Sequence, residues 1–263
     1  MRLQLLSDLH LETEALELLP APGAELLVLA GDIDSTWVGL ERFQRWPVPI
    51  LFVAGNHEFD GLDLTTALPA LRARCQALGM TFLECESIVL TARDGMRVRF
   101  VGSTRWCDFD LFGVAERERA MRAGKYFAEV MRARIDGRLF DAAAVRKVAL
   151  TCRAWLAKEL AQPAQGRWDR TVAITHFAPS ARCADPRYGL QPGTASFCNA
   201  DDDLLRFADL WLHGHLHSRH DFSVAHAKGA TRVVSQARGL AHKGETACYD
   251  GERLIAVPAA GQA

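Results

Sequence analysis

Long hydrophobic runs, paired cysteines and an excess of charge are all missing from this chain of 263 residues. No apolar stretch approaches the roughly 20 residues that a membrane-spanning helix needs, so we expect no membrane partner. The seven cysteines are odd in number, scattered and without a C-x-x-C pair. This pattern argues against a disulfide framework and indicates reduced thiols. The formal net charge is −1, so no field of the whole molecule attracts nucleic acid or anionic lipid.

The beginning of the chain supports the same interpretation. The first apolar segment ends at Leu6 and runs directly into a polar cluster, which leaves no room for the apolar region of a signal peptide. We therefore expect a cytoplasmic protein. No pattern in the sequence indicates an oligomeric state.

A short apolar run followed by a polar cluster occurs three times in the first 60 residues, at 3–6, 26–30 and 50–54. The second run is apolar throughout, which is typical of a strand buried on both faces. Helical spacing over 37–45 lies between the second and third runs and predicts a strand-helix-strand unit. Parallel open sheets bind ligands beyond the carboxyl ends of their strands, and the polar clusters fall at those ends.

The rest of the chain alternates between helical and strand patterns, which indicates an α/β protein. A mainly helical segment is expected over 112–160, interrupted near Asp136-Gly137, and a long loop over 179–199. We interpret the chain as a single domain, 1–263, with a mainly helical insertion at about 104–165. The other expected elements are a helix over 63–78 and strands over 87–91, 96–102, 171–175 and 210–212, near 222, and over 232–234 and 254–257.

Five groups of polar residues stand at the ends of successive apolar runs. They are Asp8-x-His10, Gly31-Asp32, Gly55-Asn56-His57-Glu58, His176 and Gly214-His215-x-His217. Residues two apart in extended backbone point to the same side, so the members of an Asp-x-His or His-x-His pair can reach one centre. Imidazole, carboxylate and amide groups bind metals of the borderline to hard kind. Each group alone has an ordinary explanation as a turn, a cap or a buried histidine, but all five in this order favour a metal centre.

This order of motifs resembles the calcineurin-like metallophosphoesterase superfamily, over residues 8 to 217. The resemblance implies a fold of two mixed β-sheets packed as a sandwich and flanked by helices, in four layers (αββα). It also implies a dinuclear metal centre at one edge, with Asp32 between the two ions and His57 as a catalytic residue that faces the phosphate. The remaining ligands would be Asp8, His10 and His217 on one ion, and Asn56, His176 and His215 on the other.

The sequence departs from the family pattern at one position. The family often has Gly-Asp-x-x-Asp, whereas here Asp34 comes one residue early. Asp34 and Glu58 are therefore both candidates for the acid that orients His57. His213 is a candidate for a supporting position behind the ligands.

The expected function is metal-dependent hydrolysis of phosphoesters, as a phosphodiesterase or a phosphatase. The mixed ligand set suits Mn²⁺, Fe or Zn²⁺, in a divalent or mixed-valence pair, better than Mg²⁺. Our hypothesis is direct in-line attack by a bridging hydroxide, with His57 assisting at the leaving oxygen. The expected partner is a small phosphoester, with a nucleotide among the candidates.

Two alternatives stay open at this point. The segment 112–160 has eleven Lys or Arg against six acids, so a nuclease with Trp106 or Tyr126 stacking on bases is one of them. An ordinary solvated helix face of alternating charge is the favoured explanation of this segment. The other alternative is a non-catalytic scaffold of the same fold. Such scaffolds lose ligands, and here every ligand position is filled.

Overall fold

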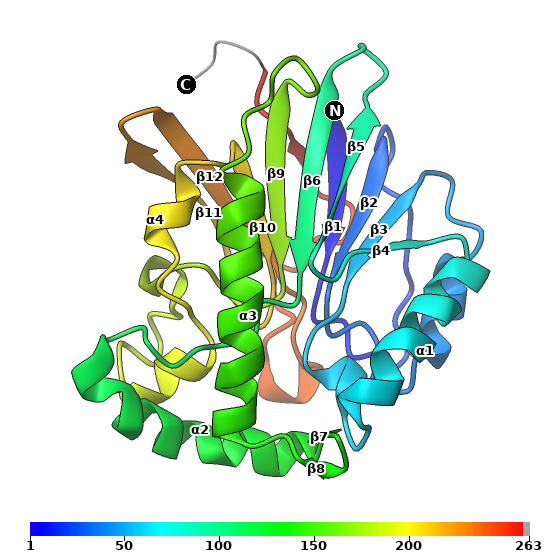
Figure 1. Cartoon of the computed structure of the whole chain (residues 1–263). Coiled ribbons are helices and arrows are strands. Elements are labelled where there is room, and N and C mark those ends of the chain that lie inside the picture. The colour runs from blue at the N-terminus through cyan, green and yellow to red at the C-terminus, as the bar shows by residue number, and fades with distance from the viewer. Residues whose placement is uncertain (260–263) are drawn as a thin grey trace.

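The computed structural model describes residues 1–259, without the side chain of Phe127. Two mixed β-sheets pack face to face, and helices cover their outer faces (Figure 1). Alternate residues of the strands point inward and form the core between the sheets, as the two-residue period of a strand requires. Val28 belongs to this inner core, whereas its neighbours Leu27 and Leu29 pack under the helices on the outer side. The prediction of a four-layer sandwich is confirmed.

The first sheet has five strands in the order β13-β1-β2-β3-β4. Strands β1 to β4 are parallel, so their carboxyl ends share one edge, while β13 pairs with β1 in the antiparallel sense. The bounds are β1 Arg2–Leu6, β2 Leu26–Ala30, β3 Ile50–Val53, β4 Thr81–Phe82 and β13 Leu254–Ala256.

The second sheet has six strands in the order β11-β12-β10-β9-β6-β5. Its four central strands are parallel, and the two edge strands are antiparallel to their neighbours. The bounds are β5 Glu86–Thr91, β6 Arg97–Ser103, β9 Arg170–Thr175, β10 Leu210–His213, β11 Arg219–His226 and β12 Gly229–Gln236.

The helices are α1 Leu64–Ala77, α2 Arg117–Met131, α3 Ala142–Leu160 and α4 Asp202–Leu205. Helix α3 packs along the outer face of the six-stranded sheet, and α2 lies across its lower end in Figure 1. Asp141 caps α3 by accepting a hydrogen bond from the backbone of Ala144. No helix within residues 1–259 is both long and apolar enough to cross a membrane.

Two expectations for local structure need correction. The helical spacing over 37–45 forms only the 3₁₀ helix Val38–Phe43, because Pro47 and Pro49 follow too soon for longer helix. The segment 112–160 contains two helices rather than one interrupted helix. A two-stranded hairpin, β7 Arg134–Ile135 and β8 Arg138–Leu139, separates them and turns at Asp136-Gly137, where both residues have positive φ.

Candidate metal centre

Loops at the carboxyl ends of the parallel strands bring the predicted ligand positions together. In each of two groups, the possible ligand atoms all lie within 4.8 Å of one another. The groups are Asp8, His10 and His217, and Asp32, His176 and His215. Asn56 joins the second group, because its Oδ1 atom lies 3.2 Å from Nε2 of His176. All seven positions proposed from the sequence thus converge at one edge of the sandwich.

Five of these residues have a left-handed backbone. The φ angles are 53° at Asp8, 47° at His10, 53° at Asp32, 70° at His215 and 50° at His217. This conformation costs a non-glycine residue about 1–3 kcal/mol, and such strain gathers at functional sites. The loops therefore hold these side chains in a geometry that the isolated chain would not choose.

Two glycines allow the loops to approach one another. A Cβ atom on Gly55 would lie 2.1 Å from Oδ1 of Asp32, and one on Gly214 would lie 2.5 Å from Oδ2 of Asp8. Neither contact is possible for real atoms, so only glycine fits at either position. The glycines that precede the ligands in sequence are needed for space around the carboxylates.

The first group presents its nitrogen atoms in a form suited to a metal. Nδ1 of His10 lies 3.2 Å from Oε1 of Glu12, and Nδ1 of His217 lies 2.6 Å from Oε2 of Glu245. Because ionised carboxylates only accept, both Nδ1 atoms carry hydrogen, and each neutral ring then has a lone pair on Nε2. The two Nε2 atoms face each other at 3.1 Å, and the buried Oδ2 of Asp8 has no hydrogen-bond partner. This arrangement is favourable when a cation lies among these atoms, so the residues fit a metal ion.

The second group is also oriented by hydrogen bonds. Nδ1 of His176 donates to the carbonyl of Ala30 at 2.9 Å, which turns Nε2 toward Oδ1 of Asn56 and Oδ2 of Asp32, both at 3.2 Å. Burial opposes a charge on His176, yet Asp32 raises its pKa to about 9. Burial likewise opposes ionisation of Asp32, but His176 and His57 hold its pKa well below the usual value. Strong attraction between these groups shows that the site favours positive charge beside Asp32.

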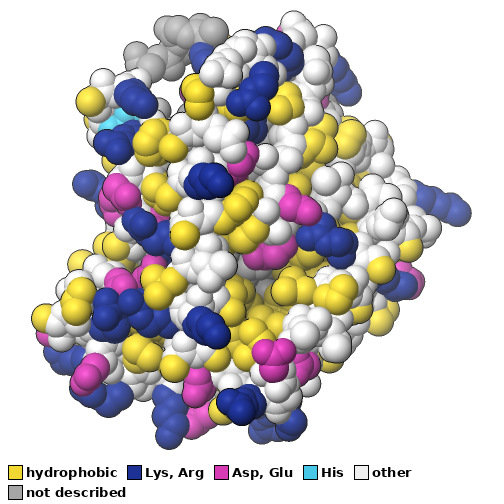
Figure 2. All heavy atoms as spheres, viewed as in Figure 1, with side chains coloured by type: hydrophobic (Ala, Val, Ile, Leu, Met, Phe, Trp, Pro, Cys, Tyr) yellow, Lys and Arg dark blue, Asp and Glu magenta, His cyan; other side chains and the backbone are white. Residues whose placement is uncertain are grey.

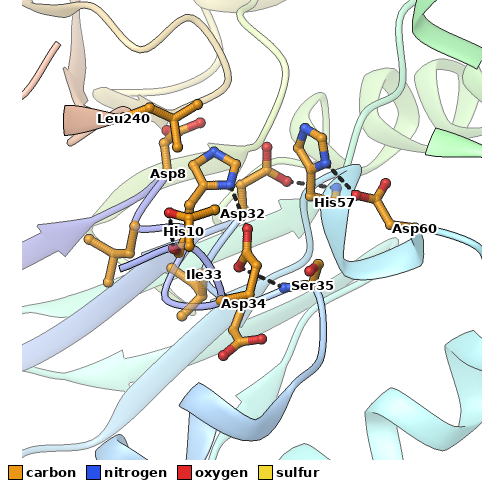
Figure 3. Close-up of polar contacts among 12 residues, drawn as sticks. Asp8, His10, Asp32, Ile33, Asp34, Ser35, His57, Asp60 and Leu240 are labelled. Atoms are coloured by element: carbon orange, nitrogen blue, oxygen red, sulfur yellow. Dashed lines mark hydrogen bonds and ion pairs between the residues drawn. The ribbon is translucent and has the colours of Figure 1, made fainter. Parts of the chain in front are cut away.

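His57 lies at the edge of the centre, with 28% of its side chain exposed. Its backbone N–H donates to Oδ1 of Asp32 at 2.8 Å, and its Nδ1 atom donates to Oδ2 of Asp60 at 2.7 Å (Figure 3). Burial opposes the charge of the ring, but Asp32 and Asp60 raise the pKa of His57 to about 10. Asp60 was not among the residues predicted from the sequence. The sequence does hold a sign of this contact. Asp60 follows His57 by three residues, and the 3₁₀ helix His57–Phe59 brings side chains at that spacing together.

The two acids suggested by the sequence for this role make other contacts. Asp34 accepts from the backbone of Thr36 at 2.7 Å and of Gly39 at 2.7 Å, and so shapes its own loop. Glu58 accepts three backbone hydrogen bonds, and neither acid is the hydrogen-bond partner of His57. The donors to Glu58 are the N–H groups of Asp32, Ile33 and Gly55, at 2.9, 2.7 and 2.6 Å.

Glu58 therefore joins the loops after β2 and β3. Burial and the nearby charge of Asp32 raise the pKa of Glu58 to about 7. His213, the third supporting residue expected from the sequence, is fully buried and contacts His220 instead of a ligand, with 2.8 Å between their Nε2 atoms.

A cavity of about 660 Å³ opens over the two groups. His10, Asp32, Asn56, His57, His215 and His217 line it. Its walls also include residues of α2 and of the long loop before α4, among them Tyr126, Val130, Tyr188 and Phe197. The cavity thus combines the polar residues of the centre with side chains that are apolar or aromatic.

Comparisons with known proteins agree with this geometry. A family model described as calcineurin-like phosphoesterase matches residues 1–219. Among solved structures, the phosphopantetheinyl hydrolase PptH from Mycobacterium tuberculosis is similar, with a TM-score of 0.70 and 19% identity. That alignment covers 96% of this chain and 95% of the other, and at such low identity it shows a common fold. The comparison with curated proteins finds no match.

Proposed function

The chain belongs to the calcineurin-like phosphoesterase family, and we propose that it hydrolyses small phosphoesters at a dinuclear metal centre. The observation that carries this proposal is the pair of Nε2 atoms of His10 and His217, which face each other at 3.1 Å. Carboxylates hold both Nδ1 atoms, so a cation between the rings is the natural partner of the two lone pairs.

We assign each group of side chains one metal ion. Asp8, His10 and His217 would hold one ion, Asn56, His176 and His215 would hold the other, and Asp32 would contribute to both. The oxygen and imidazole donors suit Mn²⁺, Fe or Zn²⁺. When bound, two such cations activate water as a nucleophile and offset the charge of the phosphoryl group.

His57 is the proposed catalytic acid. Asp60 accepts the Nδ1 proton, so Nε2 is the atom available to the cavity that His57 lines. A proton on Nε2 can be donated to the leaving oxygen, and the charged ring can stabilise the oxygens of the phosphoryl group. Asp60 keeps the ring in this orientation and compensates its charge.

The walls of the cavity favour a small phosphoester with an organic group of some length. Helix α2, which belongs to the insertion that we place at about 104–165, turns Ala123, Tyr126 and Val130 toward the cavity. These side chains can cover an organic group but offer no charge to it. A phosphodiester or monoester of a pantetheine-like group, suggested by the name of PptH, is a suitable first substrate.

The charges of α2 do not favour a nuclease. Its basic side chains pair with acids of the same helix and of the turn before it, and Figure 2 shows basic and acidic groups interspersed on the visible face. The pairs are Arg119–Glu116 at 3.5 Å, Arg122–Glu118 at 3.7 Å and Lys125–Glu129 at 3.8 Å. Exposed pairs of this kind form an ordinary solvated face rather than a track for phosphates.

The proposal is tested with nitrophenyl mono- and diesters and a pantetheinyl diester, each in the presence of added Mn²⁺. We expect hydrolysis by the wild type, loss of activity on chelation, and a reduction of at least about 10²-fold in Asp32→Asn and His57→Ala. His226→Gln is the control, because His226 contacts Thr231 on the outer hairpin, away from the centre. Activity that survives both chelation and Asp32→Asn would disprove the proposal.

A further inference from the structure

A third cluster of metal-type ligands lies behind strand β10, apart from the seven residues assigned above. It consists of Cys183, His213 and His220, whose possible ligand atoms all lie within 4.8 Å of one another. Cys183 ends the 3₁₀ helix Ala181–Cys183 in the long loop. His213 is the last residue of β10, and His220 lies near the start of β11. The long loop thus meets the two successive strands β10 and β11 at one point.

The hydrogen bonds of His213 fix which nitrogen faces the cluster. Its Nδ1 atom lies 3.0 Å from the carbonyl oxygen of Gly214, and a carbonyl can only accept, so Nδ1 carries the hydrogen. In the neutral ring, Nε2 then presents a lone pair, and it faces Nε2 of His220 at 2.8 Å. A histidine that ligates a metal commonly donates its other N–H to a carbonyl in this way.

The cluster is buried, with one side chain toward solvent. The residue Cys183 is 1% exposed and His213 is fully buried, while His220 is partly exposed and leaves a path to solvent.

We propose that Cys183, His213 and His220 bind a third metal ion, Zn²⁺. One thiolate and two imidazoles form a ligand set typical of zinc, with a fourth position open to water. On binding, the Cys183 S–H bond breaks, its proton passes to water, and the sulfur electron pair forms the bond to zinc. No oxidation or reduction is involved.

The ion would fasten the long loop to the second sheet. That loop also carries Ser196, whose carbonyl lies 3.2 Å from Nε2 of His215, and Phe197, whose ring stacks on His215 at 5.0 Å between centroids. A zinc ion at Cys183 therefore stabilises the wall that positions one ligand of the dinuclear centre. The role is structural, and it does not depend on which phosphoester is hydrolysed.

Cobalt(II) substitution tests the proposal, because a thiolate bound to cobalt gives a charge-transfer band in the near ultraviolet. The seven residues of the dinuclear centre include no cysteine, so the band cannot arise there. After removal of metals and reloading with Co²⁺, we expect the band in the wild type. We also expect Cys183→Ser to lack the band and to bind one cobalt ion fewer per chain by elemental analysis. This variant also distinguishes Cys183 from the thiols of Cys85 and Cys152, which lie together elsewhere.

Matched variants decide among the alternatives. Cys198→Ser changes a neighbouring buried thiol outside the cluster and should keep the band. His220→Gln, on a partly exposed edge strand, should weaken cobalt binding at least about 10-fold, and it provides the test if Cys183→Ser fails to fold by circular dichroism. A wild type without the band, which is the result expected if His220 merely donates a hydrogen bond to His213, overturns the proposal. Persistence of the band in Cys183→Ser or undiminished cobalt affinity in His220→Gln also overturns it. Phosphoesterase activity is measured separately, so loss of the band and loss of the proposed function are distinguishable.

Discussion

Asp60 holds the ring of His57 through a hydrogen bond of 2.7 Å, and this contact can be tested directly. Asp60→Asn keeps the size of the side chain but removes the charge that compensates the imidazolium. We expect kcat to fall about 10- to 100-fold, the range seen for outer partners of catalytic groups, with little change in KM. The measurement is steady-state hydrolysis of a nitrophenyl ester.

The control for Asp60 is Asp94→Asn, which changes an exposed acid of the turn before Met96. If Asp60 only supports the fold, Asp60→Asn should lose thermal stability together with activity. Unchanged stability together with a lower kcat, and recovery of part of the rate in Asp60→Glu, would support positioning of the ring. An unchanged kcat in Asp60→Asn would remove Asp60 from the mechanism.

Glu58 gives a prediction about stability at the same scale. Its carboxylate accepts three backbone N–H groups, from two different loops. Glu58→Gln places an amide NH₂ against at least one of those donors, so one buried hydrogen bond is lost and a donor stays unpaired. We expect a loss of about 1–3 kcal/mol in the free energy of unfolding, measured by urea denaturation. If the urea midpoint of Glu58→Gln equals that of the wild type, the hydrogen bonds of Glu58 do not stabilise the two loops.

The five polar groups could be recognised from the sequence because each follows an apolar run, and strand ends of a parallel sheet converge. The choice of seven ligand positions within them came from the family resemblance. Asp60 was missed because the family pattern favours an acid shortly after Asp32, whereas the hydrogen bond is formed by a residue in the next loop. The cluster at Cys183 could not be found either. Its members lie in a loop and two strands whose pairing only the folded chain reveals.

At the scale of elements, a buried ion pair fastens the end of β6 to the loop before α4. The guanidinium of Arg105 is fully buried and contacts both carboxylate oxygens of Asp201 at 2.8 Å and Asp108 at 2.8 Å. Burial opposes its charge, but Asp201 and Asp108 raise the pKa of Arg105 above the usual range. The loop that carries the cavity wall is therefore attached to the second sheet by charge as well as by packing.

Removal of this guanidinium leaves buried carboxylates without their partner. We expect Arg105→Ala to lower the free energy of unfolding by about 3–5 kcal/mol, measured by chemical denaturation. Arg153→Ala is the matched control. Arg153 also contacts Asp201, at 3.0 Å, but a third of its side chain is exposed, so we expect a loss of about 1 kcal/mol or less. Equal losses in the two variants would show that burial does not govern this network.

Strand β2 was predictable from its continuous apolar run, and helix α1 was predictable from its helical pattern. The segment 112–160 was only partly predictable, because helix-forming residues continue on both sides of the turn at Asp136-Gly137. Whether that turn kinks one helix or separates two depends on the pairing of Arg134 and Ile135 with residues across the turn. The short helix α4 has no sustained period at all.

For the whole molecule, the sandwich follows from two sheets whose central parallel strands are buried on both faces. The apolar runs of these strands could be read from the sequence, but the packing of one sheet on the other came only from the family resemblance. The centre lies where the two sheets contribute strand ends to the same edge. Metal binding should therefore couple to the stability of both sheets at once.

Removal of metal tests this coupling. Because the ligands converge only in the folded chain, a bound cation stabilises the native state, by about 2.7 kcal/mol at a concentration 100 times its dissociation constant. We expect chelation to lower the thermal midpoint of the wild type and added Mn²⁺ to restore it, as followed by circular dichroism. Asp32→Asn should lose the rise of the midpoint with added Mn²⁺, whereas His57→Ala should retain it, because the role proposed for His57 is to supply a proton and not to bind metal. If the midpoint of Asp32→Asn still rises with Mn²⁺ as much as that of the wild type, the cation is bound elsewhere, and the assignment of ligands at this edge fails.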